Sequence, residues 1–376
     1  MLFSREPKTR IGEFYDREKE LEMFFKGIDA GEGLIVVYGV RRIGKTSFVY
    51  VGLNELNIPF VPLDLRKYSE NPILLTPSAI AYVVDDVLKE YDLPGKLWKT
   101  GEKILEYIKS VEIPLFKLKP SRGRKKLLIN VLEKANKWAK RKETRIAVVL
   151  DEAQELRTVP AWRNILAWAV DTLENISFII TGSEIGVLND FLKLSDPKSP
   201  LFGRAKLEIK LERFSREQSI GFLLKGFEEA NIKVSIGEIK EAADKLDGIV
   251  GWLSLYGYYR VTYGLNHVET LKRLEEEAEE LLSSELEKLV KYSPRRYTAI
   301  LWAISLGLNS WSTIKHFAEG ILGHIPDSKF NKLLQNLVKY GFIEKTENLK
   351  YKIADPLLSK AVEKLRRKHR VCIKEK

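Results

Sequence analysis

Eight consecutive residues near the amino end of the chain have the types and spacing that bind a phosphate chain. They match the pattern G-x-x-x-x-G-K-[ST] and are Gly39, Val40, Arg41, Arg42, Ile43, Gly44, Lys45 and Thr46. Glycines let backbone N–H groups turn toward an anion, a lysine supplies positive charge, and a threonine hydroxyl can bind Mg²⁺. We therefore expect Lys45 to contact the β- and γ-phosphates of a nucleotide and Thr46 to hold Mg²⁺, with Ser47 completing the nucleotide contacts.

Two carboxylates, Asp151 and Glu152, follow a second apolar run over residues 146–150. An acidic residue after a strand is often only a helix N-cap, but here it accompanies a phosphate-binding loop. Together the two motifs predict that Asp151 holds the Mg²⁺ shell through water and that Glu152 is the general base that polarises an attacking water.

Three later residues fit the same chemistry less specifically. Thr181 and Ser183 end another apolar run, where a hydroxyl could sense the γ-phosphate or position water, although both residue types are common in turns. Arg204 precedes a fifth run, where its guanidinium could act as an arginine finger, in cis or on a neighbouring subunit, or form an ordinary surface ion pair.

The elements that must position these residues are short apolar strands separated by helical stretches. Continuous apolar strands that alternate with helices indicate a parallel sheet covered on both faces, an α/β fold. The strands are expected over residues 34–38, 59–65, 146–150, 176–181 and 206–211. An insertion over 76–142 carries helical patterns at 77–91 and 127–141, separated by a basic loop over 114–126, and no function is predicted for it.

After residue 211 the strand pattern stops and helical patterns follow. They cover residues 215–230, 236–245 and 251–263, and a highly charged connector helix spans 267–290. We therefore expect three domains: an ATPase core over 1–212, a helical lid with the connector over 213–290, and a basic domain over 291–376.

The last of these domains has the pattern of a winged helix. Helices are expected over 297–306, from Ser312 onward, and over 327–340 with Asp327 or Ser328 as the cap, followed by an alternating hairpin over 342–353. In such a module the third helix enters the major groove and the wing touches phosphates. The candidate DNA contacts are Lys329, Asn331, Lys332, Gln335, Asn336 and Lys339 on the helix, and Lys345, Lys350 and Lys352 on the wing.

The charge of the chain is concentrated in this domain. The formal net charge is +11, and residues 291–376 hold 18 Lys/Arg against 7 Asp/Glu, so they carry all of the excess. A positive excess confined to one domain favours binding to a polyanion such as duplex DNA, although winged helices also bind proteins and a basic tail can simply be solvated.

The composition also excludes some kinds of site. With one cysteine and four unclustered histidines, any metal must be held by oxygen ligands. No apolar run is long enough to span a membrane, and no signal peptide is evident, which predicts a soluble, cytoplasmic protein.

With these motifs the chain resembles, over nearly its whole length, the archaeal ATPases of the STAND/AAA-like P-loop superfamily. GVRRIGKTS resembles the phosphate-binding loop of that family, LDEAQEL its acidic strand end, TGSE its fourth-strand signature and PLFGR its glycine-arginine box. Residues 14–21, FYDREKEL, are similar to a short box that packs near the adenine, which implies that Phe14 and Arg17 contact the nucleotide. The resemblance implies a P-loop NTPase fold of the ASCE type: a five-stranded parallel sheet in the order 5-1-4-3-2, an all-helical lid and a C-terminal winged helix.

We therefore predict an ATPase that uses ATP/ADP and Mg²⁺ and whose nucleotide state sets the arrangement of lid and winged helix, as a DNA-linked or regulatory switch. ATP would bind between the sheet and the lid. Two alternatives stay open. One is an oligomeric, motor-like ATPase in which Arg204 completes the site of a neighbour. The other is a scaffold that retains ADP with little turnover and binds an acidic protein partner through its basic end.

Overall fold

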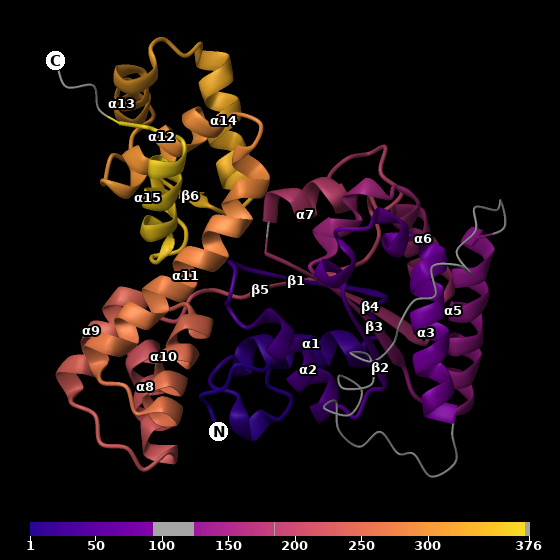
Figure 1. Cartoon of the computed structure of the whole chain (residues 1–376). Coiled ribbons are helices and arrows are strands. Elements are labelled where there is room, and N and C mark those ends of the chain that lie inside the picture. Colours follow the sequence, from indigo (N-terminus) through magenta and orange to yellow (C-terminus); the bar gives the residue numbers. More distant parts are fainter. Residues whose placement is uncertain (93–123, 184, 373–376) are drawn as a thin grey trace. The chain divides into compact units, whose positions relative to one another are not determined.

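The computed structural model describes residues 1–92, 124–183 and 185–372 (Figure 1). The chain divides into two compact units. One unit comprises residues 6–39 and 44–212, and we call it the sheet unit; the other comprises residues 1–5, 40–43 and 213–376, and we call it the helical unit. The basic loop expected between the two helices of the insertion lies largely outside the described residues.

The sheet unit is built on five parallel strands. Their order is β2-β3-β4-β1-β5, which is the predicted order read from the other edge, and the parallel α/β fold is confirmed. The strands are β1 (Leu34–Tyr38), β2 (Phe60–Asp64), β3 (Ile146–Asp151), β4 (Ile176–Gly182) and β5 (Leu207–Lys210). Each lies within its predicted range or extends it by one residue, and β3 and β4 are buried along their whole length.

Helices cover both faces of this sheet (Figure 1). The face that carries Val36, Val148 and Phe178 packs against α3 (Pro77–Asp92), α5 (Arg124–Arg141), α6 (Ala161–Thr172) and α7 (Ile185–Leu192). The other face packs against α1 (Glu18–Asp29) and α2 (Lys45–Glu55), and Gly27 on α1 leaves the room that Leu207 fills. Short 3₁₀ turns complete the unit, at η1 (Ile11–Glu13), η2 (Leu65–Tyr68), η3 (Pro72–Leu75) and η5 (Ala153–Thr158).

The helical unit contains the predicted lid and winged helix. The lid helices are α8 (Arg216–Glu229), α9 (Ile236–Leu246) and α10 (Val250–Tyr263), and the connector is α11 (His267–Val290). The winged helix consists of α12 (Pro294–Ser305), α13 (Trp311–Leu322), α14 (Asp327–Lys339) and the antiparallel hairpin of β6 (Ile343–Lys345) and β7 (Tyr351–Ile353). A last helix, α15 (Leu358–Lys368), was not predicted and packs on α11 and α12.

Two of the predicted helix caps are wrong. Ser310, not Ser312, caps α13, because its hydroxyl accepts the backbone N–H of Thr313 and the helix starts earlier. At α14 the N-cap position is Pro326, without a side-chain cap. The Asp327 carboxylate cannot serve there because it lies in the first turn and pairs with Lys315 at 2.8 Å. Within the described ranges, none of the helices is long and apolar enough to cross a bilayer.

The first five residues belong to the helical unit because Phe3 is inserted between α8 and α10. The Phe3 ring lies 5.7 Å from the ring of Phe222 and 5.0 Å from that of Phe227, and it is 3% exposed. A Cβ placed on Gly226 or Gly257 would come within 2.2 or 2.3 Å of this ring, so both positions must be glycine.

Phe3→Ala is expected to destabilise the helical unit, because it leaves a ring-sized cavity between two helices. Loss of a buried phenylalanine costs about 3–5 kcal/mol of unfolding free energy. Denaturant unfolding followed by circular dichroism measures this loss, with Leu224→Ala on the exposed face of α8 as the control. Equal unfolding midpoints for the two variants would contradict the packing role of Phe3.

Candidate functional site

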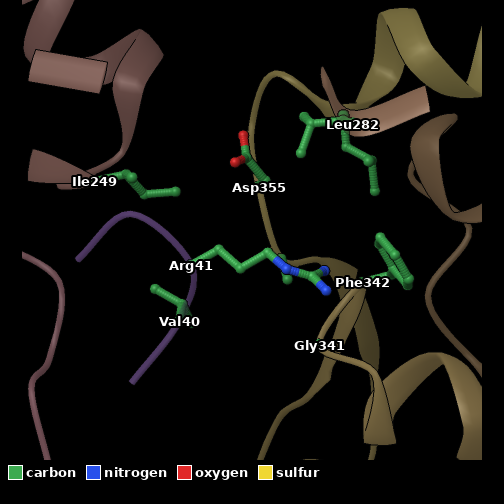
Figure 2. Close-up of a pocket in the computed structure, with 9 residues that line it drawn as sticks. Val40, Arg41, Ile249, Leu282, Gly341, Phe342 and Asp355 are labelled. Carbon is green, nitrogen blue, oxygen red and sulfur yellow. The ribbon is translucent and has the colours of Figure 1, made fainter. Parts of the chain in front are cut away.

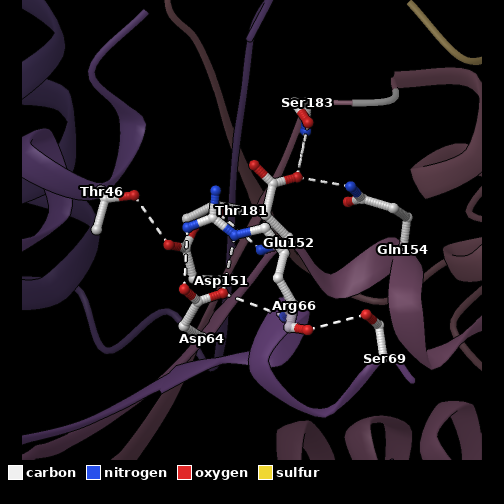
Figure 3. Close-up of polar contacts among 9 residues, drawn as sticks. All are labelled: Thr46, Asp64, Arg66, Ser69, Asp151, Glu152, Gln154, Thr181 and Ser183. Carbon is white, nitrogen blue, oxygen red and sulfur yellow. Dashed lines mark hydrogen bonds and ion pairs between the residues drawn. The ribbon is translucent and has the colours of Figure 1, made fainter. Parts of the chain in front are cut away.

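The carboxyl ends of β1, β3 and β4 meet at one edge of the sheet, since these parallel strands are neighbours. This edge gathers the residues that the motifs predicted from three distant parts of the chain. Thr46, Asp151, Glu152, Thr181 and Ser183 form one network of hydrogen bonds (Figure 3).

Asp151 is the centre of this network. It is 2% exposed, and its carboxylate accepts hydrogen bonds from the hydroxyls of Thr46, at 2.9 Å, and Thr181. Burial raises the pKa of Asp151, and the neighbouring carboxylate of Glu152 raises it further. Thr46 and Asp151, the two predicted Mg²⁺ ligands, are thus in contact with each other.

Glu152 lies beside Asp151 with a different set of partners. Its Oε2 atom accepts the side-chain amide of Gln154 at 2.6 Å, and the hydroxyl and backbone N–H of Ser183 at 2.7 and 3.2 Å. Burial opposes ionisation, but the Lys45 ammonium and these hydrogen bonds outweigh it, so the pKa of Glu152 is lowered. Glu152 is therefore a carboxylate, the form that a general base requires.

Lys45 begins α2 and is 5% exposed. Its ammonium donates to the carbonyl of Gly39 at 3.1 Å, so the lysine folds back over its own loop. Gly44, just before it, has φ of 90°, a left-handed conformation that glycine adopts without strain. The residues that follow Gly44 present backbone N–H groups at a helix N-terminus, which suits an anion.

The middle of the phosphate-binding loop, residues 40–43, groups with the helical unit. The carbonyl of Arg42 accepts the backbone N–H of Gly251 at 2.8 Å, which satisfies a donor in the first turn of α10. The Arg42 guanidinium lies 3.8 Å from the ring centre of Trp252, whose indole N–H donates to the buried carboxylate of Asp355.

Arg41 reaches another part of the same unit. Its side chain extends toward Phe342, 4.7 Å from the ring centre, across a small pocket (Figure 2). It also forms an ion pair with Glu285 of α11 at 3.1 Å and donates to the carbonyl of Tyr340 at 3.3 Å. The side chains of these two loop arginines contact the lid, the connector and the winged helix, and their predicted contacts with a nucleotide stay a prediction.

Two further residues of this edge, Gln154 and Arg66, were not predicted from the motifs. Gln154 donates to Glu152, and Arg66 on η2 donates two hydrogen bonds of 3.0 and 2.9 Å to Asp64, beside Asp151 and Glu152 (Figure 3). Arg66 could have been predicted from its position directly after β2. Because β2 is the neighbour of β3, polar residues after β2 lie at the same edge of the sheet.

Three predicted residues lie away from the network. Arg204 precedes β5 and therefore lies at the amino edge of the sheet, where it forms two hydrogen bonds of 2.8 and 2.6 Å with Asp171. Arg17 is buried, donates to the carbonyl of Glu212 just beyond β5, and pairs with Glu20 at 3.1 Å. Phe14, half-buried, follows η1.

The predicted DNA-contacting surface is only partly available. The apolar side of α14 is buried, as predicted, and the helix and wing expose Lys329, Asn331, Lys332, Gln335, Lys345, Lys350 and Lys352. Asn336 and Lys339 are half-buried, and the Asn336 amide donates to the Tyr297 hydroxyl at 2.8 Å. Asn331 accepts the Trp311 indole N–H at 2.6 Å, and Lys352 pairs with Glu344 at 3.0 Å.

Part of the positive charge of the last domain is neutralised within the helical unit. Three lysines of α15 pair with glutamates of α11: Lys360 with Glu275 at 3.5 Å, Lys364 with Glu279 at 3.9 Å, and Lys368 with Glu287 at 2.6 Å. These three lysines of α15 therefore contribute less to the free positive charge of the domain than the sequence count suggests.

Among the described residues, no three His, Cys, Asp or Glu side chains come together as a ready metal site. The donors present are the hydroxyl of Thr46 and the carboxylate of Asp151, both oxygen ligands. This set fits Mg²⁺, which keeps several waters and takes few protein ligands.

Residues 14–255 match a family model described as an ATPase domain predominantly from Archaea, and residues 291–354 match the MCM protein C-terminal winged helix-turn-helix domain. The comparison with curated proteins found no match.

Two solved structures share the whole architecture. The Walker-type ATPase PABY2304 of Pyrococcus abyssi is 33% identical, with a TM-score of 0.80 over 96% of this chain and 100% of that one. The Aeropyrum pernix ORC2 protein, in ADPNP-ADP complexes, is 13% identical, with a TM-score of 0.61 over 97% of this chain and 96% of that one, which shows a shared fold. From the match over residues 14–255 and this 33% identity, the chain belongs to the ATPase family found predominantly in Archaea.

Proposed function

We propose that the protein binds Mg-ATP at the carboxyl edge of the sheet and hydrolyses it to ADP and phosphate. The observation that carries this proposal is the contact of Thr46 with Asp151 at 2.9 Å, beside an ionised Glu152 and the buried Lys45. The test is steady-state ATP turnover, with and without duplex DNA, by the wild-type protein and by Glu152→Gln.

Each of these residues has a separate task in the proposed reaction. Lys45 exchanges its contact with the Gly39 carbonyl for the phosphate oxygens, where its charge offsets the negative charge of the transition state. Thr46 and Asp151 would hold Mg²⁺, which would supply positive charge to offset the negative charge of the phosphates. Glu152 orients the attacking water and takes its proton.

We further propose that the nucleotide state is transmitted to the lid and the winged helix through the loop arginines. Arg42 contacts the start of α10 through its carbonyl and Trp252 through its guanidinium, while Arg41 contacts Glu285 and Phe342. A loop that rearranges around phosphates cannot move without changing these contacts. This supports a regulatory switch in which the winged helix is the element that responds.

Duplex DNA is the partner that we propose for the winged helix. Lysines exposed on α14 and the wing supply the charge, since binding to DNA depends on neutralised phosphates. The role proposed for Arg204 in the site of a neighbouring copy stays a prediction. Its place at the amino edge of the sheet argues against action within its own site.

Replacing Lys329 and Lys332 together by alanine is expected to weaken duplex binding and flatten its salt dependence. Each lost phosphate contact lowers the slope of log K against log salt by about 1, so the slope should fall by about 2. Fluorescence anisotropy with labelled duplex at several salt concentrations measures it. The control removes the same charge elsewhere, from Lys233 and Lys272, both exposed on the lid side of the helical unit. An unchanged slope in the α14 variant would exclude this surface.

A further inference from the structure

Arg213 is the first residue of the helical unit after β5, and its side chain binds both the lid and the wing. The side chain is 16% exposed, and its guanidinium forms an ion pair with Asp247, in the turn between α9 and α10. Its Nη2 atom donates to Glu344 of β6 at 2.5 Å and to the carbonyl of Ala354, just after β7, at 2.6 Å. One side chain therefore connects the lid to both strands of the wing.

The backbone beside Arg213 is fixed to the same turn of the lid. The N–H of Phe214 donates to the carbonyl of Gly248 at 3.0 Å. Gly248 has φ of 70°, and a Cβ at this position would lie 2.1 Å from the carbonyl oxygen of Phe214, so the turn requires glycine. The turn leads into α10, where the N–H of Gly251 donates to the carbonyl of Arg42 at 2.8 Å. The phosphate-binding loop and Arg213 thus contact the same short segment of the lid.

Glu344 joins Arg213 to one of the wing lysines proposed to contact DNA. Its Oε1 atom accepts from Arg213, and its Oε2 atom pairs with Nζ of Lys352 at 3.0 Å. Glu344 and Lys352 are register partners across the β6–β7 hairpin, which brings their side chains together. The Lys352 side chain is 53% exposed, so a second anion can reach its ammonium. A DNA phosphate that approaches the wing must therefore compete with Glu344 for this lysine.

The two ion pairs of Glu344 depend on each other because they share one carboxylate. When Lys352 turns to a phosphate, the charge of Glu344 acts on Arg213 alone. When a movement of the lid withdraws Arg213, the same charge acts on Lys352 alone and keeps it from DNA. The position of the lid therefore changes the affinity of the wing for DNA, and by linkage DNA changes the stability of that position to the same extent.

We propose that Glu344 is a positioning residue that withholds Lys352 from DNA and, through Arg213, couples the affinity of the wing for duplex DNA to the position of the lid. This inference rests on the proposed function, in which the winged helix binds duplex DNA and responds to the nucleotide. The group that competes with Glu344 is a backbone phosphate, which carries no base information. The bridge from Arg213 through Glu344 to Lys352 thus sets how tightly the wing binds and not which sequence it selects.

Glu344→Gln tests the proposal, because the amide has the same size but no charge and one acceptor oxygen in place of two. Fluorescence anisotropy with a labelled duplex should show binding that is up to about fivefold tighter, the factor by which an exposed ion pair restrains its lysine. The slope of log K against log salt should steepen by about 1, since one more phosphate is contacted. Glu347→Gln, exposed on the same wing, removes the same charge outside the bridge and should keep the wild-type slope.

Arg213→Gln breaks the bridge from the other side. In this variant Lys352 stays with Glu344, so the affinity for duplex should not rise. Wild-type affinity should differ at least about fivefold between the ADP form and the form with a non-hydrolysable ATP analogue. This difference should disappear in both Arg213→Gln and Glu344→Gln, whereas a merely structural role would not separate their effects on affinity. Arg213→Lys keeps the charge without the fork of donors and replaces Arg213→Gln if that variant fails to fold.

If wild-type affinity depends on the nucleotide and folded Glu344→Gln keeps either that dependence or the wild-type salt slope, the inference is overturned and the proposed function stands. Equal duplex affinity of the wild type in both nucleotide states would overturn the coupling, while turnover by the wild type and by Glu152→Gln still decides whether the protein hydrolyses ATP. Absence of salt-dependent duplex binding by the wild type would overturn the DNA partner and this inference together.

Discussion

Lys45→Ala is expected to weaken ATP binding severely. The ammonium is buried, and its partner is the Gly39 carbonyl of the same loop, so it is placed to move onto a phosphate without crossing open solvent. Removing one member of a buried, hydrogen-bonded charge pair costs about 2–5 kcal/mol. The dissociation constant for ATP should therefore rise by at least about 30-fold, and by 1,000-fold or more at the upper end of this range.

Isothermal titration calorimetry with a non-hydrolysable ATP analogue measures this loss. Lys19→Ala, an exposed lysine on α1, removes the same charge outside the loop and should bind as the wild type does. Because Lys45 also favours the ionised form of Glu152, circular dichroism must show that the variant is folded. Near wild-type affinity in folded Lys45→Ala would exclude the loop as the phosphate site.

Glu152→Gln is expected to stop hydrolysis and leave ATP binding intact. The amide is the same size as the carboxylate, and its oxygen can still accept the hydrogen bonds of Gln154 and Ser183. It cannot take a proton from water. Loss of a general base lowers kcat by about 10²–10⁴-fold.

The measurement is steady-state phosphate release, with affinity for the ATP analogue determined in parallel. Glu155→Gln is the matched control, since this residue lies on the same turn, η5, and pairs only weakly with Arg157 at 4.0 Å. Turnover in Glu152→Gln equal to that of the control would remove Glu152 from the reaction.

The sheet and the site residues could be predicted because each depends on a local pattern. Apolar runs such as 146–150 define buried parallel strands, and neighbouring strands in such a sheet bring their carboxyl ends to one edge. Lys45, Thr46, Asp151 and Glu152 follow from motifs whose spacing is fixed by that geometry.

What could not be predicted depends on partners far apart in the chain. Nothing near Phe3 indicates that it fills the space left by Gly226 and Gly257, and nothing near Arg204 indicates Asp171. The net charge of the last domain follows from its composition. The ion pairs between α15 lysines and α11 glutamates depend on how the two helices pack, which composition does not indicate. Gln154 lies inside a recognised motif, but its hydrogen bond to Glu152 depends on how the chain turns after β3, which the sequence does not show.

The stacking of Arg42 on Trp252 gives the phosphate-binding loop an optical signature. The indole lies against a guanidinium at 3.8 Å and donates its N–H to a buried carboxylate, so the electric field across this chromophore depends on both contacts. Its ultraviolet absorption and emission therefore differ according to whether the loop keeps or releases the ring. Trp252 lies against the phosphate-binding loop, so its fluorescence is expected to report a rearrangement of that loop.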